Sequence, residues 1–220
     1  MGFTKEFEVQ AHGNTKLQVT HTNELHKAAT IFEQYERHLE FERHKIIRVD
    51  VEYTNNVGQD QKPALVQLSV GKDHLALLFQ LSAADKNCTR FDNFLADPRY
   101  TFVGFSIDSD IEMLGRVRLE IAHFVDIQKE WRVPTATKPL DSLWDASGIL
   151  VHDVELTNTE KQRWARTPLS MRHIGYAAKD AYAAYEIWSH LTIIQQGLHR
   201  AKLDKKQTSK RARSCGDYNY

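Results

Sequence analysis

Two acidic residues interrupt an apolar, β-branched run at residues 46–53, IIRVDVEY. Side chains two residues apart on a strand share one face, so Asp50 and Glu52 are expected on the same side as Arg48. Like charges on one face of a central strand repel each other and lose hydration, and a divalent cation would relieve both costs. The alternative is a solvated strand end with Arg48 as counter-ion, because structural ion pairs give the same pattern.

A third acidic residue, Asp110, lies in FVGFSIDSDIEML, where an expected strand passes through Gly104 and turns into a helix. Asp110 would lie in the first turn of that helix, where the helix dipole favours a carboxylate, and Asp108 is the expected N-cap. Alternatively, both acids are only capping groups. Asp126, at the end of the next expected strand, is interpreted as structural.

Tyr176 and Asp180 lie in YAAKDAYAAYEIW, an Ala-rich segment with a helical pattern. The four-residue spacing places the two side chains on one helix face, one turn apart. Ala177 and Ala178 are small, and they would let this helix approach a sheet closely. The other interpretation is a core tyrosine beside an ordinary helix carboxylate.

Taken together, these three segments resemble the motifs of the tyrosine subclass of the DEDD-superfamily 3′-5′ exonucleases. The resemblance covers about residues 45–195, and it includes KPALVQLSV, TFVGFSIDSDIEML and the Pro-Leu-Ser stretch before YAAKDAY. It is strongest to Werner-type exonuclease domains and the related small plant exoribonucleases. The histidine subclass places His where this chain has Gly175. Tyr53 is a departure, because relatives commonly have Trp directly after the Asp-x-Glu.

The resemblance implies a metal-dependent reaction at a 3′ end. Asp50, Glu52, Asp110 and Asp180 would hold two Mg²⁺ or Mn²⁺ ions, which prefer carboxylate oxygen. Tyr176 would orient the attacking water. The expected products are nucleoside 5′-monophosphates from single-stranded RNA or DNA, with RNA slightly favoured. Four crowded carboxylates repel one another, so the metal-free site is expected to bind ions weakly.

Substrate contacts are expected just before the Tyr-x-x-x-Asp helix. Arg163, Trp164 and Arg166 interleave cations with an aromatic side chain, as single-strand-binding surfaces do. The alternative is a solvated basic turn with Trp164 packed into the core. Phe105 is a further candidate contact for a terminal base, on the resemblance only. His173 is out of register with the histidine subclass and is expected at the surface or in the substrate groove.

The surrounding sequence predicts the elements that carry these residues. A hairpin is expected around Gly13 and Asn14, and Asn23 is expected to cap a helix that runs to about residue 39. Further strands are expected at 46–53, 64–70, 74–81, 100–106 and 121–127. Helices are expected at 88–95 and 108–117, and helical patterns follow the last strand as far as residue 199. This order predicts an α/β fold with a mixed central sheet flanked by helices. The resemblance makes it a three-layer, ribonuclease H-like fold.

The charge is distributed unevenly along the chain. The 220 residues include 29 basic and 29 acidic side chains, but residues 200–220 carry a net +5 and residues 1–199 a net −5. We expect one exonuclease domain over residues 1–199 and a disordered basic tail after it. The tail could capture nucleic acid or serve as a nuclear address, and the alternative is a solvated end.

Other classes of protein fit less well. No apolar run reaches the roughly 18 residues of a membrane span, so no membrane partner is expected. Cys88 and Cys215 form no CxxC, which favours an intracellular location, in the nucleus, the cytoplasm or both. Scattered histidines without HExxH make a zinc hydrolase a weak alternative. The main alternatives are a non-catalytic nucleic-acid-binding or assembly module and a DNA-directed Werner-type exonuclease. A homo-oligomer is compatible with the sequence but not indicated by it.

Overall fold

The computed structural model describes residues 1–11, 15–54, 61–71, 75–84, 89–130 and 156–215. Within these ranges, seven strands form one mixed sheet in the order β1-β2-β5-β4-β3-β6-β7. The strands are β1 (Thr4–Gln10), β2 (Lys16–Thr22), β3 (Ile46–Tyr53), β4 (Pro63–Ser69), β5 (Leu75–Phe79), β6 (Thr101–Gly104) and β7 (Phe124–Asp126). The β2–β5, β3–β6 and β6–β7 pairs are parallel and the other pairs are antiparallel. The turn expected at Gly13 and Asn14 lies outside the described residues.

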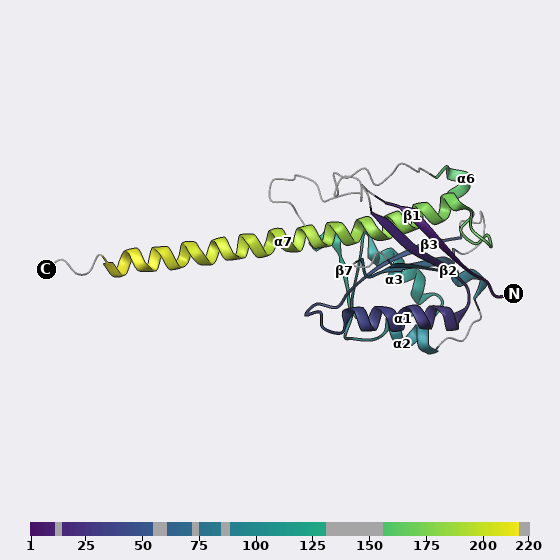
Figure 1. Ribbon diagram of the computed structural model, residues 1–220, viewed down its shortest axis with the longest axis horizontal. Helices are drawn as coiled ribbons and strands as arrows, with labels where there is room; N and C mark the ends of the chain where they lie inside the picture. The colour runs from purple at the N-terminus through teal and green to yellow at the C-terminus, as the bar shows by residue number, and fades with distance from the viewer. Residues whose placement is uncertain (12–14, 55–60, 72–74, 85–88, 131–155, 216–220) are drawn as a thin grey trace. The chain divides into compact units, whose positions relative to one another are not determined.

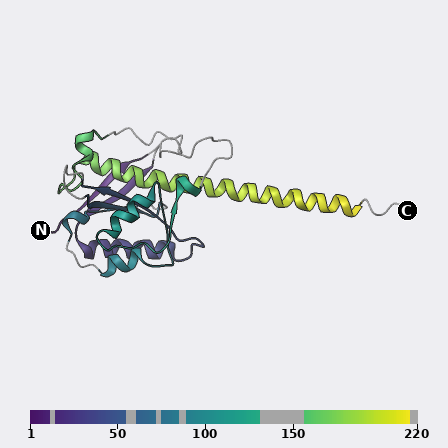
Figure 2. The same ribbon diagram turned by 180° about the vertical axis from the view of Figure 1, so that it is seen from behind.

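Helices cover both faces of this sheet (Figures 1 and 2). They are α1 (Leu25–Leu39), a 3-10 turn (Leu81–Ala83), α2 (Thr89–Leu95), α3 (Ile107–Gly115), α4 (Ile127–Glu130), α6 (Asn158–Lys161) and α7 (Met171–Cys215). Helices α1 and α2 pack on one face, and the first turns of α7 pack on the other. The expected three-layer α/β fold with a mixed central sheet is therefore confirmed.

Each sheet face has its own apolar core, because the side chains of a strand alternate between faces. Under α1 and α2 the core is aromatic, and the rings of Phe32 and Phe94 stack with centroids 4.1 Å apart. Under α7 the core contains Leu65, Leu78 and Ala178. The second face also carries Asp50, so the chemistry predicted from the sequence lies on the α7 side.

Two expected helix caps are wrong. The N-cap of α1 is Glu24, because the side chain of Asn23 accepts a hydrogen bond from the Phe3 N–H at 2.7 Å and donates to the Ala83 carbonyl at 2.8 Å. The N-cap of α3 is Ser106. Asp108 pairs instead with Lys129. In both cases a partner distant in the sequence takes the polar side chain away from the local cap.

Helix α7 differs from the expected end of the domain. The chain divides into compact units at Met1–Glu186 and Ile187–Tyr220, and α7 is continuous as far as Cys215. Residues 200–215 of the expected disordered tail are thus described as helix. The sequence allows this because no Gly or Pro occurs from 198 to 215, where Lys, Arg, Ala and Gln are good helix formers. Residues 216–220 lie outside the description, and the boundary after residue 199 stays a prediction.

Candidate active site

Parallel pairing of β3 with β6 places the acidic motifs at one edge of the sheet. Arg48 on β3 is paired with Val103 on β6, so the chain beyond Arg48 runs beside the end of β6 and the start of α3. The two strands approach closely at Gly104, where a Cβ atom would lie 2.9 Å from the carbonyl oxygen of Val49. Asp110, in the first turn of α3, is thereby brought toward Asp50.

Small residues let α7 approach the same face of the sheet. Ala177 and Ala178, on the side of α7 that packs on the sheet, are fully buried. Gly71 has a φ of +73°, and a Cβ there would lie 2.2 Å from the ring of Tyr185 on α7. A larger residue at position 71 would therefore push the helix away. This close packing places Tyr176 and Asp180 beside the β3 acids.

Four carboxyl groups from three elements interact electrostatically at this edge. Asp110 is buried, and Asp50, Glu52 and Asp180 are half-buried. Burial is the main cause that raises the pKa of each group, and it raises the pKa of Asp110 to about 8. The charge of Asp50 further raises the pKa of the other three. The predicted ligands thus lie near one another and repel when ionised.

Two cations offset part of this repulsion. Arg48 is only 2% exposed, and its charge lowers the pKa of Asp50 against the larger effect of burial. Lys161, at the end of α6, lowers the pKa of Glu52 and of Asp180 in the same way. Asp50 and Glu52 are half-buried, so this strand end is only partly solvated, unlike in the alternative for the β3 acids. The expected counter-charge from Arg48 is present.

The donor chemistry of the site fits a divalent cation. All four groups are carboxylates, and Oδ2 of Asp110 is buried with no hydrogen-bond partner among the described residues. In the described part of the chain, no three His, Cys, Asp or Glu side chains are close enough together to hold an ion. The four carboxylates are therefore not arranged around a common point. A bound cation would have to draw the carboxylates together.

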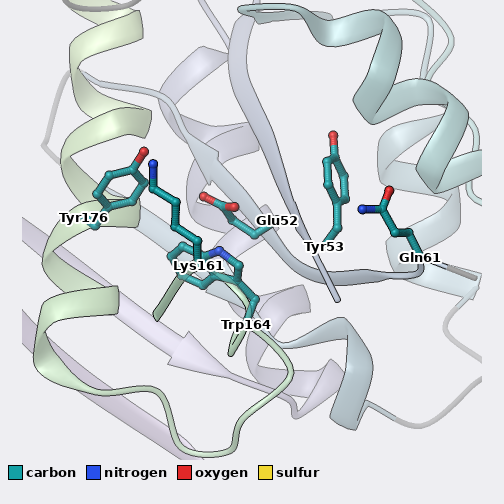
Figure 3. A pocket seen from close by; sticks show the side chains of 6 residues that line it. All are labelled: Glu52, Tyr53, Gln61, Lys161, Trp164 and Tyr176. Atoms are coloured by element: carbon teal, nitrogen blue, oxygen red, sulfur yellow. The ribbon is translucent and has the colours of Figure 1, made fainter. Parts of the chain in front are cut away.

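A cavity of about 300 Å³ opens beside Glu52. Its lining residues are Glu52, Tyr53, Gln61, Lys161, Trp164 and Tyr176 (Figure 3). The Glu52 carboxylate lies between Tyr176 and Lys161 on one side and Tyr53 on the other. Burial, followed by the charge of Asp180, raises the pKa of Tyr176. Tyr176 therefore keeps its phenolic proton at neutral pH and can act as a hydrogen-bond donor.

Sequence reasoning missed the position of Tyr53. Its hydroxyl donates a hydrogen bond to Oδ1 of Asp110, across the junction of β3 and α3. The only signal in the sequence was the departure itself, a tyrosine where relatives commonly have Trp.

The expected nucleic-acid contacts lie in different environments. Arg163 and Arg166 are exposed and line a second cavity of about 360 Å³. Trp164 is 1% exposed, and its ring packs edge-on against His173 with centroids 4.8 Å apart. Trp164 therefore forms part of a cavity wall and not an exposed stacking surface. Phe105 is half-buried between β6 and α3 and is not among the residues that line either cavity.

His173 does not lie at the surface, but it lines the second cavity with Arg163 and Arg166, so its expected place in the substrate groove stays a prediction. His173 is 5% exposed, and its Nδ1 is hydrogen-bonded to the hydroxyl of Ser170 at 2.7 Å. Its Nε2 donates to the carbonyl of Glu160 at 3.0 Å, so it joins α6 to the start of α7. Asp126 agrees with its structural interpretation, because its Oδ1 accepts a hydrogen bond from the Gln128 N–H at 2.9 Å.

Comparison with known sequences identifies a family. Residues 26–194 match the family described as 3′-5′ exonuclease. The human exonuclease mut-7 homolog is 28% identical over 171 residues, which is 66% of this chain and 19% of that protein. The chain therefore spans about a fifth of the length of this curated relative.

Solved structures share the fold at low sequence identity. The EXO domain of Aedes aegypti Nibbler has a TM-score of 0.60 and 18% identity, over 79% of this chain and 88% of that one. The catalytic core of Trypanosoma brucei RRP6 has a TM-score of 0.63 and 15% identity, over 82% and 48% of the two chains. Escherichia coli RNase D has a TM-score of 0.56 and 21% identity, over 84% and 48%.

The raised carboxyl pKa values predict that the metal-free protein loses stability as pH rises. Between the ordinary carboxyl pKa of about 4 and the Asp110 value of about 8, the folded protein binds more protons than the unfolded chain. Its free energy of unfolding must then fall with increasing pH. Asp110→Asn should flatten this dependence and raise stability at pH 8 by more than about 1 kcal/mol, close to the cost of one pKa unit.

Urea denaturation in EDTA from pH 5 to pH 9 measures this effect. Asp108→Asn is the matched control, because it removes an exposed acid from the same helix and leaves the four buried or half-buried carboxyl groups in place, so the fall in stability with pH should remain. A profile of Asp110→Asn identical to that of the wild type would show that the buried carboxyl does not titrate as stated.

Proposed function

The chain belongs to the 3′-5′ exonuclease family of the DEDD superfamily, and on that premise we propose that it removes nucleoside 5′-monophosphates from the 3′ end of single-stranded nucleic acid with the help of divalent cations. The observation that carries this proposal is the meeting of carboxyl groups from β3, α3 and α7, each of which changes the pKa of another. Such strongly perturbed acids at the edge of a cavity are typical of functional sites.

Four carboxylates would form the metal site. Asp50, Glu52, Asp110 and Asp180 would hold two Mg²⁺ or Mn²⁺ ions, which would stabilise the attacking and leaving oxygens of an in-line displacement at phosphorus. Tyr176 would orient the attacking water with its phenolic oxygen, a role supported by its place in the cavity beside Glu52.

The surroundings of the carboxylates suit an anionic substrate. Lys161 lines the cavity beside Glu52 and would face a phosphate bound there. Arg163 and Arg166, around the second cavity, would contact the backbone further along the strand. Trp164 would shape the first cavity from its buried position, and Phe105 stays a candidate contact to a terminal base.

We further propose that RNA is slightly preferred over DNA. The support comes from a protein that shares the fold, E. coli RNase D, which is an exoribonuclease involved in structured RNA processing. A nuclear or cytoplasmic location and a homo-oligomer stay predictions. Digestion of single- and double-stranded RNA and DNA side by side, with free and blocked 3′ ends, would establish the substrate class.

Asp50→Ala should abolish degradation of a 5′-labelled single-stranded oligonucleotide. The wild type is expected to give a ladder shortened from the 3′ end with Mg²⁺ or Mn²⁺ and no products in EDTA. Loss of the carboxylate should lower the rate by at least about 100-fold, beyond the 10–100-fold effect of residues that only support a ligand. Denaturing gels of the labelled products give this rate.

Asp108→Asn is again the control and should keep the wild-type rate. Full Mn²⁺-dependent degradation by Asp50→Ala would show that the site is assigned wrongly. A wild-type protein that binds the oligonucleotide but leaves it intact would favour the non-catalytic alternative.

Removal of residues 200–220 should weaken oligonucleotide binding and its dependence on salt. These residues carry a net +5, so they can displace counterions from a nucleic acid. Each lost phosphate contact should reduce the slope of log affinity against log salt by about 0.7 for a single strand. Fluorescence anisotropy from 50 to 300 mM salt measures the slope. The stabilisation by Mn²⁺ should not change.

A second variant separates charge from length, with the seven Lys and Arg residues of this segment changed to Gln. It should behave like the truncated protein if charge is the cause. Unchanged salt slopes in both variants would mean that the segment is only solvated.

A further inference from the structure

Tyr53 occupies an unusual position at the end of β3. The pairing of β3 with β4 shifts register between Glu52 and Tyr53, where Glu52 pairs with Leu65 but Tyr53 pairs with Pro63. Such irregularities bend a strand locally, and they are common next to functional sites. The Tyr53 ring packs against the core under α1 and α2, and its hydroxyl reaches Asp110 on α3.

The hydrogen bond from Tyr53 gives the two carboxylate oxygens of Asp110 different environments. Oδ1 accepts the phenolic hydrogen, whereas Oδ2 is buried and has no hydrogen-bond partner among the described residues. Asp110 is 4% exposed, so water does not easily satisfy that oxygen. The carboxylate is therefore held by one oxygen and presents the other.

We propose that Tyr53 is a positioning residue that fixes the Asp110 carboxylate so that Oδ2 can ligate a divalent cation. The proposal rests on the proposed function, because it needs a cation at the four carboxylates. Groups that hydrogen-bond to a metal ligand fix its orientation, and their loss typically costs 10–100-fold in metal affinity or activity. Tyr53 acts through Asp110 and needs no contact with the substrate.

The hydrogen bond between Tyr53 and Asp110 matters because the four carboxylates must become ordered when a cation binds. The carboxylates are not closed around an ion in the described structure, so their freedom of rotation must be lost when a cation binds. A carboxylate already held by Tyr53 loses less of this freedom. On α7, the Asp180 carboxylate has a comparable partner in Tyr176, whose hydrogen bond lowers the pKa of Asp180. The two helix-borne acids thus each have a tyrosine, and these tyrosines line the same cavity (Figure 3).

Tyr53→Phe tests the proposal because it removes the hydroxyl and keeps the ring. Melting temperature is measured against Mn²⁺ concentration in the full chain, starting from EDTA. The Mn²⁺ concentration for half-maximal stabilisation should rise about 10-fold, within the range given for such residues. At saturating Mn²⁺, the kcat and the KM for a single-stranded oligonucleotide should return to within about threefold of wild type, since the cation then holds Asp110 in place.

Tyr100→Phe is the matched control and should respond to Mn²⁺ like the wild type. Tyr100 lies just before β6, at the strand end opposite to α3. A melting temperature of Tyr53→Phe in EDTA close to that of the wild type shows that the fold is intact. If Tyr53→Phe loses stability, equilibrium dialysis of Mn²⁺ at 4 °C replaces the melting measurement.

A wild-type Mn²⁺ midpoint in Tyr53→Phe would overturn the positioning role and leave the proposed function standing. A lower kcat that persists at saturating Mn²⁺ with an unchanged midpoint would also overturn it, because Tyr53 would then act on the substrate. A wild-type protein that neither responds to Mn²⁺ nor shortens an oligonucleotide would instead contradict the proposed function itself.

Discussion

The burial of four mutually repelling carboxyl groups is the constraint on which the rest of the structure depends. Removal from water raises the pKa of Asp50, Glu52, Asp110 and Asp180 before any effect of their neighbours is added. Separate elements must supply the energy that holds these groups in place. The aromatic core under α1 and the close packing of α7 on the sheet provide it, and Arg48 and Lys161 supply opposite charge. The neutral formal charge of the chain hides this local concentration of acid.

Local rules of sequence predicted much of this arrangement. Alternation along a strand placed Asp50 and Glu52 on one face, and the strand-to-helix turn at Gly104 placed Asp110 in the first turn of α3. The i, i+4 spacing placed Tyr176 and Asp180 together. The order of strands and helices along the chain also predicted a mixed sheet. These features depend on periodicity and steric demands that neighbouring residues largely determine.

Contacts between distant segments could not be predicted in this way. The hydrogen bond from Tyr53 joins β3 to Asp110 on α3, and the near-complete burial of Arg48 depends on the packing of other elements against the sheet. The burial of His173 and the failure of Asn23 to cap α1 could not be predicted, because their partners, Glu160 and Ala83, lie on other elements. The meeting of the acidic motifs was itself expected only from the resemblance to a family, since spacing alone does not bring three elements to one edge. The polar, basic composition of residues 200–215 predicts disorder, but many of these residues are also good helix formers, and they form the end of α7.

The central claim is that the four carboxylates form a divalent-cation site, and calorimetric titration of the protein with Mn²⁺ in the presence of a nucleoside 5′-monophosphate tests it most directly. The account predicts two Mn²⁺ ions per wild-type chain and loss of at least one of them in Asp50→Ala, with the fold retained. The absence of Mn²⁺ binding in the wild type, or equal stoichiometry and affinity in Asp50→Ala, would contradict it.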